Sequence, residues 1–309
     1  MAEWLYEAGI GENRAALVKD GDIVEAAIEL PGTVRVGHVA PARLLDRVTG
    51  RVRLDSGEEA LLTGPAGVPE GGAITVAITR EAVPEQGRTK PPRATLTDAA
   101  PAAGPDLLAR ISATGLPLRQ LRSHQRDDLE SAGWSELLDE ATTGHIPLDG
   151  GALLMSPTPA MTLFDVDGTP PLDTLAVRAA TAVVHAIRRH AIGGSIGVDF
   201  PTLTGKAPRQ AVAAALDAGL SQPFERTAVN GFGFLQIVRP RPRASLPELL
   251  RADPIGAAAR ATLRRLERET GPPRPHRVSA AVFQRLHNRP DWLAELTRRT
   301  GAPPLLESQ

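Results

Sequence analysis

Two short apolar runs, each leading into an aspartate, constrain this chain more than any other feature. The first run, MTLFDVDG, carries Asp165, and the second, GGSIGVDF, carries Asp199. Short apolar runs of this kind are typical of buried strands. Between them, apolar residues recur at every fourth position from Leu175 to Ile187, which indicates an amphipathic helix that Gly193 and Gly194 are expected to end. A strand, a helix and a second strand predict a parallel βαβ unit.

The aspartates of this unit are the first candidate site residues. Neighbouring strands lie about 4.8 Å apart, and open α/β sheets bind their ligands at the carboxyl ends of strands. Asp165 and Asp199 are therefore expected side by side, where two carboxylates suit one Mg²⁺, and Mn²⁺ suits the same oxygen ligands. Asp167 lies two residues after Asp165 and shares its face of the strand. The alternative is that these aspartates only cap strand ends and turns.

One resemblance is confined to the first aspartate run. LFDVDGT resembles the nucleophile motif of the haloacid dehalogenase-type phosphatases, in which the first aspartate, here Asp165, is phosphorylated and the second, here Asp167, acts as acid and base. Those enzymes also need a Ser or Thr at a later strand end, a lysine, and a late pair of acidic residues. Here Lys206 is the lysine that follows the motif, and Asp199 stands alone as the later acidic strand end. A phosphatase is therefore kept as an alternative.

A second resemblance runs through most of the chain. IPLDGGALLMSPTPAMTLFDVDG, from Ile146, and VRAATAVVHAIRRHAIGGSIGVDF are similar to the segments that carry the two catalytic aspartates of the bacterial ribonuclease E/G family of endoribonucleases. That family's next strand and the basic segment after it are similar to FGFLQIVRPRPRASLPELL, from Phe232. The end of its RNA-binding OB fold is similar to GGAITVAITREAVPEQGRTKPPRATL. The resemblance implies that Asp165 and Asp199 are Mg²⁺ ligands. It also implies that Asp167, in place of the family's asparagine, helps to orient the scissile phosphate.

The expected fold class is α/β of the mixed α+β type. Residues 2–31 alternate apolar and polar positions around two turns, which predicts a β-meander. Short strands with Gly and Pro turns from Val34 to Ala94 suit a five-stranded barrel of OB type. Helices are predicted at Gly256–Glu269, Val278–His287 and Asp291–Thr300. The resemblance implies an OB-type barrel (34–98) inserted in an RNase H-like scaffold (1–33 and 99–145), then a DNase I-like catalytic domain (146–250) and a small helical carboxyl-terminal domain (251–309).

Several features of the family are missing from the chain. The Pro/Ala-rich segment 98–106 stands near the place where the family has a sensor domain for the RNA 5′ monophosphate, and there is no room for that domain. The chain has no cysteine, so it lacks disulfides and the family's zinc link between protomers. Gly231 stands where the family often has an arginine, and no Phe, Tyr or Trp occurs between Val34 and Ala94. We therefore expect a short form of the family with weaker RNA binding and cleavage that is indifferent to the 5′ end.

The candidate RNA-binding residues are basic side chains in three parts of the sequence. They are Arg35, Arg51 and Arg53 on the predicted barrel, Lys206 after the second aspartate, and Arg239, Arg241 and Arg243 beyond the last predicted strand of the catalytic domain. The alternative is that these are solvated surface residues. Glu3, Glu7, His185 and His190 are also expected to face solvent.

Composition is compatible with a nucleic-acid enzyme of the cytoplasm. With 309 residues the chain has room for two or three domains, and no apolar run has the length of a membrane span. Its formal net charge of −1 means that RNA must be bound by local basic patches. We therefore expect a cytoplasmic, Mg²⁺-dependent endoribonuclease acting on single-stranded RNA, with a homo-oligomer possible only without the zinc link. The alternatives are an RNA-binding relative of weak or no activity, and a phosphatase.

Overall fold

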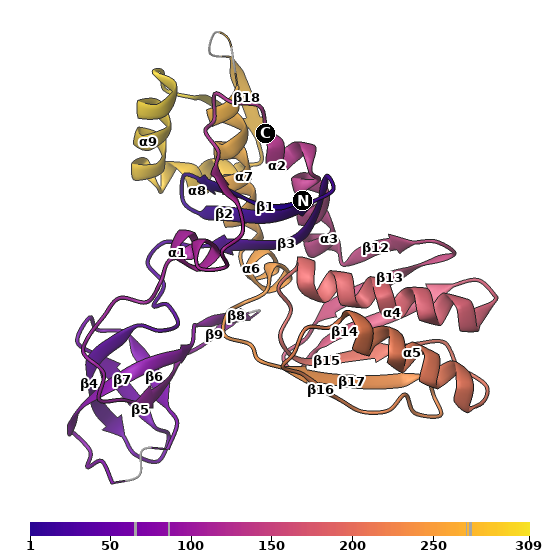
Figure 1. Cartoon of the computed structure of the whole chain (residues 1–309). Coiled ribbons are helices and arrows are strands. Elements are labelled where there is room, and N and C mark those ends of the chain that lie inside the picture. The colour runs from indigo at the N-terminus through magenta and orange to yellow at the C-terminus, as the bar shows by residue number, and fades with distance from the viewer. Residues whose placement is uncertain (65–66, 86, 270, 272–273) are drawn as a thin grey trace.

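A computed structural model describes residues 1–64, 67–85, 87–269, 271 and 274–309. The chain is of mixed α+β class, and its ribbon forms three lobes around a central sheet (Figure 1). One lobe is a barrel, the second is a sheet covered by helices on one face, and the third is a group of helices near the carboxyl terminus. No helix within the described ranges is both long and apolar enough to span a bilayer.

The central sheet is built from the first strands of the chain. β1 (Ala2–Ala8), β2 (Asn13–Lys19) and β3 (Asp22–Glu29) form the predicted antiparallel meander, and β11 (Leu118–Gln120) joins β1 in parallel. Apolar residues on both sheet faces are buried, because helices cover each face. One side packs on α1 (Leu107–Ser112), and the other packs on α2 (Asp128–Ser131), α3 (Trp134–Thr143) and α6 (Leu246–Ala252).

The barrel lies between β3 and α1 in the sequence. Its strands close in the order β10-β6-β5-β4-β7, and they are β4 (Val39–Asp46), β5 (Arg51–Leu54), β6 (Glu59–Leu62), β7 (Ala73–Arg80) and β10 (Arg93–Leu96). A small hairpin, β8 (Val83–Glu85) and β9 (Arg88–Lys90), extends from the barrel toward α6. Alternate strand residues fill the interior with Ala, Val, Leu and Ile, so the barrel has its own core. The closed five-stranded barrel confirms that part of the prediction and is consistent with an OB type.

The second lobe contains the predicted βαβ unit. Its six-stranded sheet has the order β12-β13-β14-β15-β17-β16. The elements are β12 (His145–Leu148), β13 (Gly151–Pro157), β14 (Thr162–Gly168), α4 (Leu172–Arg189), β15 (Gly194–Asp199), α5 (Lys206–Gly219), β16 (Glu225–Arg226) and β17 (Phe234–Arg239). β14 and β15 pair in parallel with α4 as the crossover, which confirms the predicted unit, and the other pairings are antiparallel. α4 and α5 lie over one face of the sheet (Figure 1).

Two details of this unit differ from the sequence prediction. The helix ends at Arg189 and not at the double glycine, because Ala191 already has a positive φ of 54°. His190, expected at the surface, is fully buried, and its ring Nε2 lies 3.1 Å from the Glu140 carboxylate of α3. Burial lowers the pKa of His190, while the bond to Glu140 opposes that shift.

The third lobe confirms the predicted carboxyl-terminal helices. They are α7 (Pro254–Arg268), α8 (Ala280–His287) and α9 (Pro290–Thr300), flanked by β18 (Pro275–Val278) and its parallel partner β19 (Leu305–Ser308). Their apolar faces share one core, which also takes in Ile10 from the turn between β1 and β2. The lobe therefore packs directly on the central sheet.

A cluster of ion pairs lies at the same contact between the third lobe and the central sheet. The position of Glu7 within it corrects one prediction. Glu7, expected to face solvent, is 6% exposed and contacts the guanidinium groups of Arg14, Arg264 and Arg268. Glu12 likewise accepts from Arg14 at 2.9 Å and from Arg260 at 2.7 Å. α7 is more than 240 residues away in the sequence, so the pattern around Glu7 gave no sign that a helix would cover it.

Candidate metal and RNA site

The three candidate aspartates lie on the uncovered face of the six-stranded sheet. Along β14, Phe164 and Val166 are buried toward α4, so the alternation of strand side chains turns Asp165 and Asp167 to the opposite face. Both are exposed, and so is Asp199 at the end of β15. The same apolar residues that fix the strand in the core therefore fix the carboxylates outside it.

The parallel pairing places two of these residues next to each other. Asp165 and Asp199 are Cα partners in the register of β14 and β15. Partner residues of a strand pair point to the same face, and neighbouring strands lie about 4.8 Å apart. Within the described ranges, no ion pair or side-chain hydrogen bond involves the carboxylates of Asp165, Asp167 or Asp199. The structure thus places Asp165 and Asp199 side by side, with Asp167 two residues further along β14 on the same face.

One expectation about this edge is corrected. Asp199 is the last residue of β15, but Asp165 is not the last residue of β14, which continues to Gly168. The extension follows from the hairpin, because β13 pairs with β14 as far as Gly151 and Gly168. The carboxylates accordingly sit on the open face close to the edge, and not beyond the strand ends.

The donor set fits a hard divalent cation. Mg²⁺ is commonly held by one or two carboxylates, with waters and substrate phosphate completing its shell, and Asp165 and Asp199 supply two. In the part of the chain that the structure describes, no three or more His, Cys, Asp or Glu side chains form a metal-binding group. An ion held by Asp165 and Asp199 alone would keep its other coordination positions open to water or a phosphate.

The open sheet surface beside the carboxylates is apolar and closely packed. A Cβ on Gly197, which precedes Asp199 by two residues on the same face, would lie 2.7 Å from Leu163 Cδ2 and 2.8 Å from Phe234 Cζ. Only a glycine allows these side chains to meet across β15. Leu154 of β13, the partner of Asp165, is 42% exposed and continues this apolar surface on the side away from β15.

Lys206, Arg51 and Arg53 are available for ligands but lie in different places. Lys206 is the first residue of α5, whose amino-terminal end follows Asp199 at the same edge of the sheet, and its side chain is exposed. Arg51 and Arg53 are exposed on β5 of the barrel and share Glu59, to which Arg53 donates at 2.9 Å. Lys206 thus follows the β15 aspartate by seven residues in the chain, whereas Arg51 and Arg53 belong to the barrel.

The other predicted RNA-binding arginines lie at the junction of the lobes. Arg239 pairs with Gly194 at the beginning of β15, so it stands at the opposite end of that strand from Asp199. Arg35 donates to Glu29 at 3.1 Å, Arg241 pairs with Glu248, and Arg243 pairs with Glu81 at 2.9 Å. These four arginines are all partly buried.

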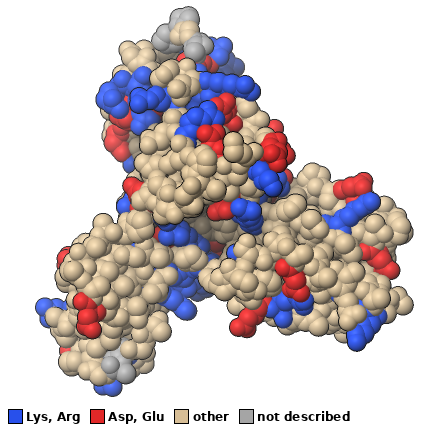
Figure 2. All heavy atoms as spheres, in the orientation of Figure 1, with Lys and Arg blue, Asp and Glu red and all other residues tan. Residues whose placement is uncertain are grey.

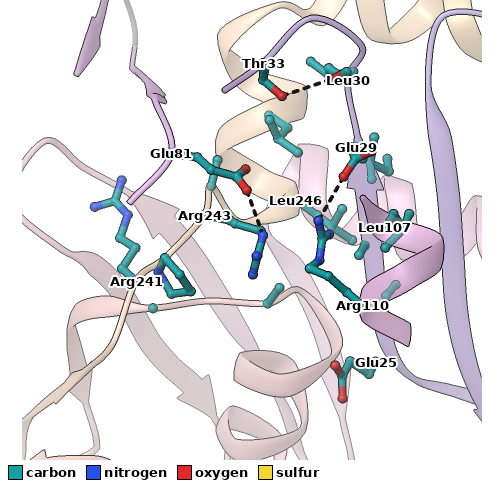
Figure 3. A pocket seen from close by; sticks show the side chains of 18 of the residues that line it. Glu25, Glu29, Leu30, Thr33, Glu81, Leu107, Arg110, Arg241, Arg243 and Leu246 are labelled. Carbon is teal, nitrogen blue, oxygen red and sulfur yellow. Dashed lines mark hydrogen bonds and ion pairs between the residues drawn. The ribbon is translucent and has the colours of Figure 1, made fainter. Parts of the chain in front are cut away.

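Arg241 and Arg243 line a cavity of about 460 Å³ between the central sheet, the β8–β9 hairpin and the segment after β17. Figure 3 shows Glu81 reaching Arg243 and Glu29 reaching Arg110 across it. Burial lowers the pKa of Arg243, and the nearby charge of Arg110 adds to that shift. Glu81 and Arg243 join the barrel side to the segment after β17, while Glu29 and Arg110 join β3 to α1. The alternation of Arg and Pro in the sequence did not show this structural role.

Basic and acidic side chains are interspersed on the face in Figure 2, most densely over the carboxyl-terminal helices. The barrel and the six-stranded sheet show larger areas without charge in this view. This distribution agrees with the net charge of −1 and makes any RNA contact a local one.

Comparison with known proteins supports one family. No family model matches the chain. Ribonuclease G of Escherichia coli (strain K12) and of Shigella flexneri are 31% identical to it over 113 residues, and Ribonuclease G of Salmonella typhimurium (strain SL1344) is 30% identical over the same length. The match covers 33% of this chain and 23% of each relative, so the chain spans about a quarter of the length of those relatives. Over about a third of its length, the chain is therefore related to the ribonuclease E/G family.

Proposed function

We propose that this chain is a metal-dependent endoribonuclease that hydrolyses single-stranded RNA. The observation that carries the proposal is the register of Asp165 and Asp199, two exposed carboxylates side by side on one open sheet face. The relationship to Ribonuclease G supports the substrate class. Strand-end aspartates that only cap turns would not need to coincide in register on adjacent strands.

Each aspartate has a distinct proposed role. Asp165 and Asp199 would hold Mg²⁺, or Mn²⁺, and the ion would polarise the phosphoryl oxygen and lower the pKa of the attacking water. Asp167, on the same face of β14, would help to orient the scissile phosphate through the water shell of the ion. The products would carry a 5′ phosphate and a 3′ hydroxyl, as the family resemblance implies.

We further propose a separate role for each lobe. We assign the closed barrel to an OB-type RNA-binding domain (34–98), inserted in an RNase H-like scaffold (1–33 and 99–145). The six-stranded sheet belongs to a DNase I-like catalytic domain (146–250), and residues 251–309 form the small helical domain. Support comes from the separate apolar cores of the barrel and of the six-stranded sheet.

A catalytically weak RNA-binding relative is the second candidate. Two observations favour it: the barrel segment from Val34 to Ala94 has no aromatic residue, and Gly231 stands where the resembled family often has an arginine. A phosphatase acting through a phosphorylated Asp165 is the third, and it requires only one of the two register partners.

The test is cleavage of a fluorescent single-stranded RNA in Mg²⁺, with and without EDTA, beside hydrolysis of a small phosphate monoester. Wild type is compared with Asp165→Asn and Asp199→Asn, and with Asp139→Asn as a matched control, because Asp139 is exposed on α3, outside the six-stranded sheet. The proposal predicts RNA cuts that need the metal and both site aspartates, with the control unchanged. Ester hydrolysis that needs Asp165 but not Asp199 would establish the phosphatase instead. RNA that is bound but never cut would establish the binding relative.

A further inference from the structure

We propose that Phe232 and Arg209 form a subsite for one unpaired nucleobase and its phosphate, beside the proposed metal ligands. Phe232 would stack on the base, and Arg209 would pair with the phosphate. The inference rests on the proposed function, because it places this subsite next to the scissile bond. It supplies the aromatic contact that the barrel segment cannot make.

Phe232 is displayed to solvent to an unusual degree. Its side chain is 84% exposed, whereas Phe164, Phe200 and Phe234 of the same lobe are buried or half-buried. A large apolar ring costs free energy when left in water. The sequence predicts that a strand begins at Phe232, but β17 begins at Phe234, and Phe232 lies in the loop before it.

The loop is held in one shape by its own hydrogen bonds. The Asn230 side-chain oxygen accepts from the backbone N–H of Phe232 at 2.9 Å and of Phe234 at 3.0 Å. The Asn230 N–H donates to the Phe234 carbonyl at 2.9 Å. The exposed ring therefore stands on an ordered turn, which lowers the entropy lost when it binds a ligand.

The same loop is tied to the proposed metal ligand. Phe200, which directly follows Asp199, donates its N–H to the Gly233 carbonyl at 3.2 Å. Gly233 has a φ of +97°, and a Cβ there would collide with the Phe200 carbonyl oxygen. Asp199 is also the register partner of Phe234. These contacts fix Phe232 at the edge of the sheet where the carboxylates lie.

Arg209 adds a cation at this place. It lies on the first turn of α5, where its Nε donates to the Gly205 carbonyl at 2.8 Å. Its Nη1 would be 3.8 Å from a Cβ on Gly231, so the guanidinium reaches the position where the loop itself has no side chain. Within the described ranges, Arg209 has no acidic partner. The group is free to bind a phosphate.

An aromatic face with a guanidinium beside it suits a nucleotide of a single strand. Unpaired bases stack on aromatic rings, and the backbone pairs with arginine. The ring would also suit a protein partner, including a second copy of the chain, and the test separates these occupants.

The experiment measures binding of short single-stranded RNAs in EDTA, where no metal-dependent cut occurs, by fluorescence anisotropy. One RNA is intact, and others each carry one abasic residue at successive positions. Phe232→Ala is expected to weaken binding of the intact RNA by roughly 5- to 150-fold, Phe232→Leu to weaken it less, and Phe232→Trp to preserve it. Leu305→Ala, which removes an exposed apolar side chain from β19, is the matched control and should have no effect.

The abasic series gives the sharper result. Wild type should lose affinity when one particular base is missing, and Phe232→Ala should not distinguish that RNA from the intact one. Arg209→Ala should reduce the salt dependence of binding, with the slope of log K against log salt falling by about 0.7 in magnitude. Arg209→Lys should retain most of that slope.

Each outcome decides between the two proposals. Unchanged affinity in Phe232→Ala, with cleavage still dependent on Asp165 and Asp199, would overturn the subsite and leave the ribonuclease standing. Base-dependent binding through Phe232 without any cleavage would support the subsite and overturn the ribonuclease. A change in oligomeric mass on Phe232→Ala, measured by sedimentation without loss of RNA affinity, would overturn the subsite in favour of a protein contact.

Discussion

Glu7 shows how a single residue can depend on parts of the chain that its own sequence neighbourhood does not reveal. Burial alone would raise the pKa of its carboxyl group, but the charges of Arg14, Arg264 and Arg268 outweigh burial and hold that pKa below the ordinary value of 4.5. Removing this carboxylate is costly, because Arg14, Arg264 and Arg268 would each lose one of their acidic partners, and the remaining ones, Glu12 and Asp127, would face more positive than negative charge.

Glu7→Gln is therefore expected to reduce the free energy of unfolding by about 3–5 kcal/mol. The change keeps the size of the side chain and removes its charge. Urea unfolding followed by circular dichroism gives the value. The control is Glu3→Gln on the same strand, where the side chain is 38% exposed and pairs with Arg119 at 3.2 Å, and its cost should stay within about 1 kcal/mol. Equal losses in the two variants would contradict this account of the ion cluster.

The aspartates are the residues of the site that local sequence could predict. Asp165, Asp167 and Asp199 follow apolar runs whose burial is a local pattern, and the parallel pairing then determines their face and register. Arg209 could not be found in this way, because its approach to Gly231 depends on how α5 lies beside the loop before β17. No periodicity in the sequence carries that information.

At the scale of elements, the features of the second lobe that depend on local sequence patterns could be predicted, and those that depend on long-range pairing could not. The helix and strands of the βαβ unit were predicted because apolar spacing repeats within each element. The extension of β14 to Gly168 was not, because it depends on hydrogen bonds to β13. The burial of His190 was missed for a similar reason, since Glu140 comes from α3, an element of the central sheet's core.

The two faces of the six-stranded sheet make a prediction at this scale. Phe164→Ala removes a fully buried ring packed beneath α4 and should reduce the free energy of unfolding by about 3–5 kcal/mol. Leu154→Ala alters a 42% exposed residue on the open face of the adjacent strand and should cost less than about 1 kcal/mol. Chemical unfolding of both variants checks this. If Leu154→Ala lowered the free energy of unfolding by more than this amount, the open face would have to be covered in solution, which contradicts the prediction.

At the scale of the whole molecule, the lobes are held by charged contacts as well as by apolar ones. Glu29 with Arg110 and Glu81 with Arg243 connect elements at the junction, and the ion cluster of Glu7 and Glu12 joins α7 to the central sheet. The strand and turn pattern of each segment, together with the family resemblance, indicated separate domains. The sequence could not indicate these contacts, because their partners are far apart in the chain.

The ion cluster predicts how stability depends on pH. Because the pKa of Glu7 is lower in the folded state than its ordinary value of 4.5, the unfolded chain binds the proton more tightly. Its contribution is therefore fully present above about pH 4.5 and is lost as the pH falls through the folded-state pKa. Unfolding midpoints measured from pH 7 to pH 3 should fall most steeply below pH 4.5. Glu7→Gln should flatten that decline, and an unchanged slope would exclude Glu7 as its source.

The central claim is that Asp165 and Asp199 act together on one metal ion that cuts RNA. The most direct measurement is the initial rate of RNA cleavage in Mg²⁺ by each single Asp→Asn variant and by the double variant. Each single change should lower the rate by roughly 100-fold or more, and the double variant should be no slower than the slower single one, because either loss already disables the pair. A single variant that cleaves at the wild-type rate would contradict the account.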